Sequence, residues 1–139
     1  MTIADLVVQL RDTIKDTEAL YSDVELAKRL YGAYPKWSEH TGKVLSLTYP
    51  PSLTLNVGNL TVGQARLWVL LAAEEILLHE MAEKERFNVG RHSSAAGTVD
   101  LTGVAEGHRQ ALDGLREEIK DLLLGFLGYS HPLINVGVG

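Results

Sequence analysis

The hydrophobic and polar positions of the chain are organised around one long segment, residues 61–86. It contains the longest uninterrupted apolar run, residues 67–73, it lacks proline, and strong helix formers fill it. Thr61 and Gln64 have the spacing of a capping box, which marks a helix start. In the second half the apolar residues narrow to a stripe of Leu70, Leu71, Leu77, Leu78 and Met81. The pattern predicts a long central helix that is first buried on all sides and then turns Glu80, Glu83, Lys84 and Arg86 to water.

A shorter helix is predicted at the N-terminus. Thr2 and Asp5 form a carboxylate variant of the capping box. Apolar residues follow at helical spacing, at Ile3, Leu6, Val7, Leu10 and Ile14. The opposite side, which we expect to face water, carries Arg11, Asp12, Lys15 and Asp16. This helix is expected to end near Asp16.

A second helix start is predicted by Tyr21-Ser22-Asp23-Val24-Glu25-Leu26. Ser22 is the expected cap and Glu25 closes the capping box, while Tyr21 and Leu26 are placed for a hydrophobic staple. The apolar face that follows consists of Val24, Ala27, Leu30, Tyr31 and Tyr34. We expect Pro35 to stop or kink this helix, with Trp37 packing just beyond it.

Residues 40–60 depart from helical spacing. Leu53, Leu55 and Val57 alternate with polar residues, a period typical of a strand, and Pro50-Pro51 exclude a continuous helix. We predict an extended or β-hairpin-like arm around residues 44–60. Because a two-stranded hairpin alone is marginally stable in water, the arm is expected to lie on the helices or on a partner.

The C-terminal third predicts a loop, a helix and a tail. Residues 87–98 are rich in Gly, Ser and Asn and predict the loop. One side of the last helix is lined by Val104, His108, Leu112, Leu115, Ile119, Leu122, Leu123 and Phe126, and Gly125 and Gly128 end it. Residues 129–139 predict an extended tail that either frays or adds a strand to another sheet. The fold class is therefore mainly α: a four-helix bundle with one long central helix in residues 1–128, the arm, and the tail in residues 129–139.

Composition limits the function classes. A chain of 139 residues with net charge −5 predicts one soluble domain. The absence of cysteine excludes disulfides and thiolate metal sites and suits a cytosolic origin. No apolar stretch reaches about 18 residues, so no membrane partner is expected. The chain also lacks the basic stripe that sequence-specific DNA binding needs.

Two groups of titratable residues are candidates for chemistry. His79 with Glu75 and Glu83 falls on one helix face and has the spacing of a possible metal site. The paired Glu-x-x-His of di-iron bundles is absent, so a solvated acidic face is the preferred interpretation. Glu74 falls within the apolar stripe and needs a basic partner, for which Arg109 and Arg116 are candidates. We find no nucleophile elbow and no phosphate-binding loop, and we expect no enzyme and no cofactor.

The order of these elements resembles the head-to-tail adaptor, or connector, proteins of tailed bacteriophages. The resemblance is carried by TIADLVVQLRDTIKDT, by YSDVELAKRLYGAYPKW, by the long apolar helix and by GTVDLTGVAEGHRQALDGLREEIKDLL. Ser22, Asp23, Glu25 and Leu26 best match the Tyr/Trp-Ser-Asp-x-Glu-Leu pattern of that family's second helix. The resemblance covers most of the chain outside residues 40–60 and the tail.

The resemblance implies a structural virion protein, made in the host cytoplasm and located in the neck at the head–tail interface. Such a protein forms a closed ring of about a dozen copies under the portal protein, extends the DNA channel and docks the next neck or tail protein. A net acidic chain suits a channel that DNA passes without binding. The tail would contact the portal, as an added strand, through Leu133, Ile134, Asn135, Val136 and Val138. The arm would contact a neighbouring subunit or the tail side through Leu45, Leu47, Tyr49, Leu53, Leu55 and Val57.

Two alternatives stay open. One is a neck stopper or tail-completion protein, which differs from the adaptor only in its position along the neck. The other is a free-standing cellular helical bundle that binds a metal or a small ligand through His79, Glu75 and Glu83. The second alternative predicts that a metal raises the melting temperature, because a ligand that binds the native state stabilises it.

Overall fold

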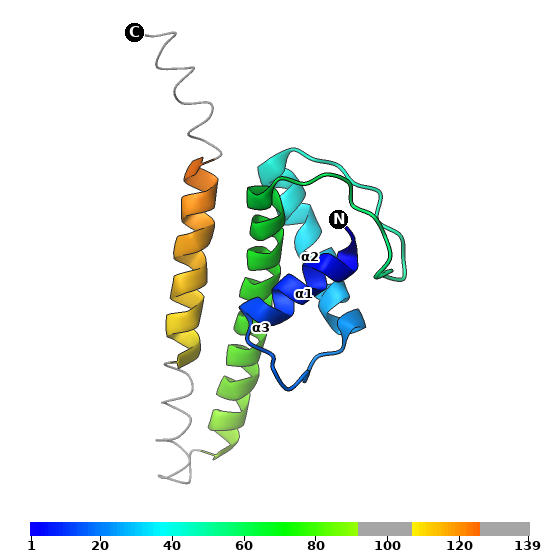
Figure 1. Cartoon of the computed structure of the whole chain (residues 1–139). Helices are drawn as coiled ribbons and strands as arrows, with labels where there is room; N and C mark the ends of the chain where they lie inside the picture. Colours follow the sequence, from blue (N-terminus) through cyan, green and yellow to red (C-terminus); the bar gives the residue numbers. More distant parts are fainter. Residues whose placement is uncertain (92–106, 126–139) are drawn as a thin grey trace, which may run out of the picture.

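A computed structural model describes residues 1–91 and 107–125, and over these residues the fold is mainly α, with four packed helices and no strand. The helices are α1 (Ile3–Thr13), α2 (Asp23–Thr41), α3 (Val62–Arg91) and a fourth helix over residues 107–125. α1, α2 and α3 contact one another, and the fourth helix runs antiparallel to α3 on its other side (Figure 1). Among the described residues, no helix is both long enough and apolar enough to cross a bilayer.

The long central helix, α3, begins as predicted. The Gln64 amide donates to Thr61 Oγ1 at 3.1 Å, and the Thr61 amide donates to Gln64 Oε1 at 3.0 Å, which completes the capping box. Residues 67–73 are all buried, as their apolar run predicts. The helix continues to Arg91, so the predicted loop is wrong for residues 87–91. Asn88 and Gly90 lower helix propensity without blocking the backbone hydrogen bonds. Residues 92–98 of that loop lie outside the described part of the chain.

The apolar stripe of α3 is narrower than predicted. Leu71 is 2% exposed and Leu77 is 9% exposed, but Leu78 is 41% exposed. Two turns earlier the core surrounds both Leu70 and Leu71, whereas here it covers Leu77 and leaves Leu78 partly open. Leu78 therefore lies at the edge of the buried stripe.

Arg11 and Asp16 hold the turn between α1 and α2. The Arg11 guanidinium donates to Asp16 Oδ2 at 2.8 Å, to the Tyr21 carbonyl at 2.9 Å and to Asp23 Oδ1 at 2.6 Å. Asp16 also accepts hydrogen bonds from the amides of Leu20 and Tyr21, at 2.8 and 3.1 Å. Our expectation that Arg11 and Asp16 face water was wrong, because Asp16 is buried and serves as the acceptor around which the turn folds.

α2 runs through Pro35 to Thr41, so of the two predicted outcomes at this proline, a stop or a kink, the stop was wrong. The predicted Ser22 cap is present, since the Glu25 amide donates to Ser22 Oγ at 3.1 Å. A proline removes one donor from a helix interior and costs about 3 kcal/mol. Burial of Trp37 two residues later, at 0% exposure, helps to offset that cost. Gly42 caps the C-terminus of α2, and its φ of 72° lies in the left-handed region that favours glycine at this position.

The fourth helix packs on α3 through part of its predicted apolar side. Leu112 and Ile119 are buried, and Leu115, Leu122 and Leu123 are partly buried against the core. Polar bridges add to this contact: Arg66 of α3 makes a two-pronged pair with Glu118, with nitrogen–oxygen distances of 3.2 and 3.0 Å. The third donor of Arg66 reaches Thr13 Oγ1 of α1 at 2.8 Å, so one side chain links three helices.

The arm is extended but it is not a hairpin. Its two halves do not pair with each other, and the described residues contain a single isolated bridge, between Thr2 and Asn56. Some of its backbone groups instead bond to the N-terminal residues and to Tyr34 of α2. The β-hairpin-like part of the prediction was therefore wrong, because alternating residues fit any extended chain that has one face on a core.

Candidate interaction surface

The first half of the arm is anchored to α2 by one tyrosine. The Tyr34 hydroxyl accepts from the Leu45 amide at 2.7 Å and donates to the Leu45 carbonyl at 3.2 Å. Tyr34 is itself fixed against Trp37 and Trp68, whose rings stack with centroids 4.7 Å apart. Both indoles donate to backbone carbonyls, Trp37 to Gln64 at 2.8 Å and Trp68 to Leu30 at 2.7 Å. The aromatic cluster between α2 and α3 therefore determines where the arm starts.

The second half of the arm caps α1. The amides of Ile3 and Ala4 donate to the carbonyls of Leu55 and Leu53, at 3.0 and 2.9 Å. The amides of Thr2 and Asp5 are satisfied by the capping box, at 2.8 and 3.3 Å. All four donors that a helix N-terminus leaves unpaired are thus satisfied. The sequence signals the box at Thr2 and Asp5, but it gives no sign that the arm supplies the other two acceptors.

The structure places five of the six predicted arm contacts against the protein's own core. Leu45, Leu47, Leu53 and Leu55 are partly buried there, and Val57 is 4% exposed. Tyr49 differs, because it is 75% exposed and touches the chain through an edge-on contact with Tyr31, with ring centroids 5.3 Å apart. Of the predicted set, Tyr49 is the residue with most of its side chain available to a partner.

The exposed face of the arm is uncharged, with exposed valines at its two ends. Val44 is 87% exposed at one end of the arm, and Val62, where α3 begins, is 88% exposed. No Asp, Glu, Lys or Arg occurs from residue 44 to residue 65. Depletion of charged residues is the compositional feature of interface centres. We therefore take this face, residues 44–65, as the candidate interaction surface and call it the uncharged face.

The predicted tail contacts, Leu133, Ile134, Asn135, Val136 and Val138, lie outside the described residues. Their contact with a portal protein stays a prediction.

The candidate metal ligands do not converge. His79 Nε2 lies 3.4 Å from Glu83 Oε1, and both side chains are at least half exposed. Glu75 turns toward α2 instead, where its Oε2 lies 3.5 Å from the position that a Cβ on Gly32 would take. Burial raises the pKa of Glu75, partly opposed by Arg29 and Lys36 and reinforced by Glu74. Within residues 1–91 and 107–125, no group of three or more His, Cys, Asp or Glu side chains is placed to hold a metal ion.

Glu74 is paired, as the sequence requires. Its Oε2 accepts from Arg116 Nε at 3.3 Å, and its Oε1 lies 3.6 Å from Lys36 Nζ. Arg116 was one of the two predicted partners, whereas Lys36 of α2 was not predicted. The carboxylate joins α2, α3 and the fourth helix, which is a structural role.

We had expected Glu80 to face water, but this residue instead bridges two elements. The Tyr21 hydroxyl donates to Glu80 Oε1 at 2.5 Å, and His108 Nε2 lies 2.8 Å from Glu80 Oε2. Burial and the hydrogen bond and charge of Glu80 raise the pKa of Tyr21. The carboxylate is drawn inward because both partners come from elements that fold against α3.

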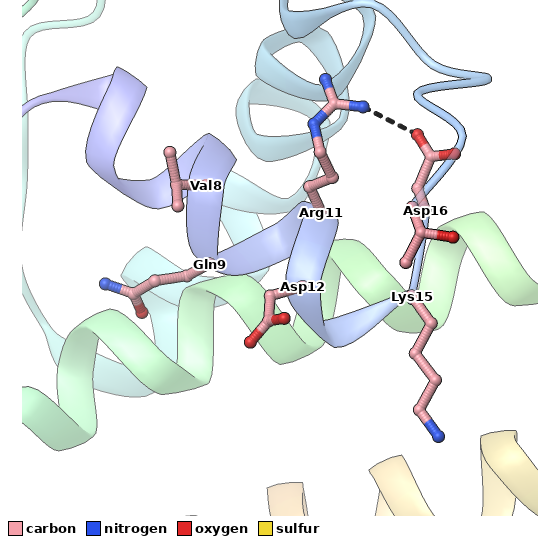
Figure 2. Close-up of a pocket in the computed structure, with 7 residues that line it drawn as sticks. Val8, Gln9, Arg11, Asp12, Lys15 and Asp16 are labelled. Carbon is pink, nitrogen blue, oxygen red and sulfur yellow. Dashed lines mark hydrogen bonds and ion pairs between the residues drawn. The ribbon is translucent and has the colours of Figure 1, made fainter.

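An open hollow of about 570 Å³ lies along α1 and the turn after it (Figure 2). It is lined by Val8, Gln9, Arg11, Asp12, Lys15, Asp16 and Thr17. Figure 2 shows the Arg11–Asp16 ion pair at its side, and this pair is already used to hold the turn. The lining contains no pair of nucleophile and base, so we assign no chemistry to the hollow.

Comparison with known proteins found no matching family model, no matching curated protein and no matching solved structure.

Proposed function

We propose that this protein is a head-to-tail adaptor of a tailed bacteriophage. In this proposal about a dozen copies form a closed ring under the portal protein, in the neck of the virion. The ring extends the DNA channel, and the next neck or tail protein docks on it. The portal contact is assigned to the tail residues 133–138.

The observation that carries the proposal is the segment 21–26 at the start of α2, which resembles the adaptor pattern. Three of the four matching residues have a structural use: Ser22 caps α2, Asp23 binds Arg11 and Leu26 is fully buried. Tyr21 reaches Glu80 of α3. The pattern thus joins α1, α2 and α3, so a protein that keeps this pattern has a reason to keep this arrangement of helices.

The charge of the chain also supports the proposal. The net charge is −5, and no basic stripe is present in the sequence. Because tight binding to DNA needs several cations that displace counterions from phosphates, an acidic ring would let DNA pass.

The experiment that tests the proposal is a quantitative protein inventory of purified virus particles. About twelve copies per particle is the expected result for one ring at one vertex. Absence of the chain from intact particles would refute the proposal. A metal titration of the melting temperature then addresses the cellular alternative, because the adaptor predicts no shift and a metal-binding bundle predicts an increase.

A further inference from the structure

We propose that the C-terminal tail of one copy pairs, as an added strand, with residues 44–48 in the arm of a neighbouring copy. This inference rests on the proposed ring and names the contact that joins its subunits. The observations that carry it are an open backbone edge in the arm, two uncharged segments in the chain, and the positions of the arm and of the fourth helix.

The first half of the arm presents an open edge. Its described hydrogen bonds are the two that Tyr34 makes with Leu45. None of the described residues bonds to the backbone of Val44, Ser46, Leu47 or Thr48. Such a row of unpaired amides and carbonyls is a template for another strand. The inner side chains, Leu45 and Leu47, are already partly buried, so pairing leaves the core in place.

The chain contains a second uncharged segment that matches this edge. After Asp121 no Asp, Glu, Lys or Arg follows to residue 139. A charged segment would lose solvation against the uncharged face, whereas the tail would not. In the tail, Ile134, Val136 and Val138 alternate with Asn135 and glycines, which gives a strand one apolar side. That side can extend the layer that Leu45 and Leu47 begin.

The positions of the elements favour a neighbouring copy as the source of the tail. The fourth helix ends at the same end of the bundle where α2 ends and α3 begins, and the arm also starts there (Figure 1). The fourth helix and the arm lie on opposite sides of α3 (Figure 1). Copies placed side by side therefore bring the fourth helix of one beside the arm of the next. From Gly125 to Asn135, an extended chain reaches up to about 35 Å.

This contact is heterologous, since two different surfaces meet, and a heterologous contact forms a ring when the rotation between copies closes. A strand has two edges, so pairing with the arm leaves the other edge of the tail for the portal protein. The subunit contact and the proposed portal contact are therefore compatible.

Cysteine cross-linking tests the proposal, because the chain has no cysteine of its own. Ser46→Cys is placed in one copy and Asn135→Cys in an isotope-labelled second copy, and the mixture is oxidised mildly. A disulfide needs Cα atoms within about 7 Å, so it reports direct pairing. Thr48→Cys covers a register that is shifted by one side-chain repeat. The control is Asp12→Cys, an exposed position on α1, away from the arm.

We expect the 46–135 or the 48–135 link between labelled and unlabelled copies to exceed the 12–135 link by about tenfold or more, because docking raises the effective concentration of the thiols. Equal linkage at the control position, or no linkage at either arm position, would overturn the inference. The double variant Ser46→Cys with Asn135→Cys should form covalent multimers. If it formed only a disulfide within one chain, the tail would belong to its own copy and the proposal would be wrong. The particle inventory separates the two proposals: twelve copies per particle without the cross-link would leave the adaptor standing and remove this contact.

Discussion

Leu71 and Leu78 of α3 should respond very differently to truncation, although the sequence places both in one apolar stripe. They are two turns apart in the same helix and have the same chemistry, so Leu71→Ala and Leu78→Ala change helix propensity equally. Their burial differs, because Leu71 is 2% exposed and Leu78 is 41% exposed. The pair therefore isolates the contribution of packing.

The expected magnitudes follow from burial. A fully buried Leu→Ala change removes transfer free energy and leaves a cavity, which together cost about 3–4 kcal/mol. At Leu78 solvent already reaches the side chain and no closed cavity forms, so the cost should be about 1 kcal/mol. With a urea m-value of about 2 kcal/mol/M, the unfolding midpoint should fall by about 1.5–2 M for Leu71→Ala and by about 0.5 M for Leu78→Ala.

Urea unfolding followed by tryptophan fluorescence measures both values. Trp37 and Trp68 are buried and stacked in the core, so their emission reports the loss of tertiary packing. Equal midpoints for the two variants would refute the assignment of α3's buried stripe. A greater loss for Leu78→Ala would show that α3 is rotated relative to α1 and α2.

Three further predictions concern the polar contacts. Burial raises the pKa of Glu75, so the charged form of this residue disfavours folding, and the stability of the protein should fall as pH rises above the unfolded pKa of about 4.3. Glu75→Gln should remove this pH dependence and leave the protein at least as stable at pH 7. Thermal melts at several pH values would show both effects. Burial raises the pKa of Asp16, but the hydrogen bonds from Tyr21 and Leu20 and the charge of Arg11 outweigh burial and lower this pKa, so the contribution of Asp16 to stability is present above about pH 4 and is lost as pH falls through the folded pKa. Asp16→Asn should therefore be less stable than the wild type at pH 7 and should lose less stability on acidification. Acid titrations in which both proteins lose stability in parallel would contradict this prediction. Tyr34→Phe should speed hydrogen exchange of the Leu45 amide about tenfold, because the hydrogen bond from this amide to the Tyr34 hydroxyl contributes on the order of 1.4 kcal/mol. Hydrogen-exchange mass spectrometry measures this rate. An unchanged rate would mean that other contacts hold the arm.

The helix starts could be predicted because their signals are local. Thr2, Ser22 and Thr61 each accept a hydrogen bond from the backbone amide three positions later in the chain. Helix ends were predicted less well. Pro35 and Gly90 weaken a helix, and whether it ends there depends on packing that the local sequence does not contain.

The candidate surface required the tertiary structure. Period-two alternation in residues 44–60 predicts an extended chain with one covered face, but not which group covers it. The sequence left open whether the helices or a partner cover the arm, and the structure packs all six apolar arm residues except Tyr49 against the core. Glu80 was misplaced for the same reason, since its partners are 59 and 28 positions away along the chain.

By itself, the sequence determined the helical class, the long central helix, the buried run at residues 67–73 and the three capped starts. Each of these depends on propensity, periodicity or contacts within one turn, which are written in neighbouring residues. The tertiary structure alone decided that α2 passes through Pro35, that Arg11 and Asp16 turn inward, and that the arm caps α1 and leaves the edge at 44–48 open. These outcomes depend on which distant groups meet in space, and no local pattern specifies that.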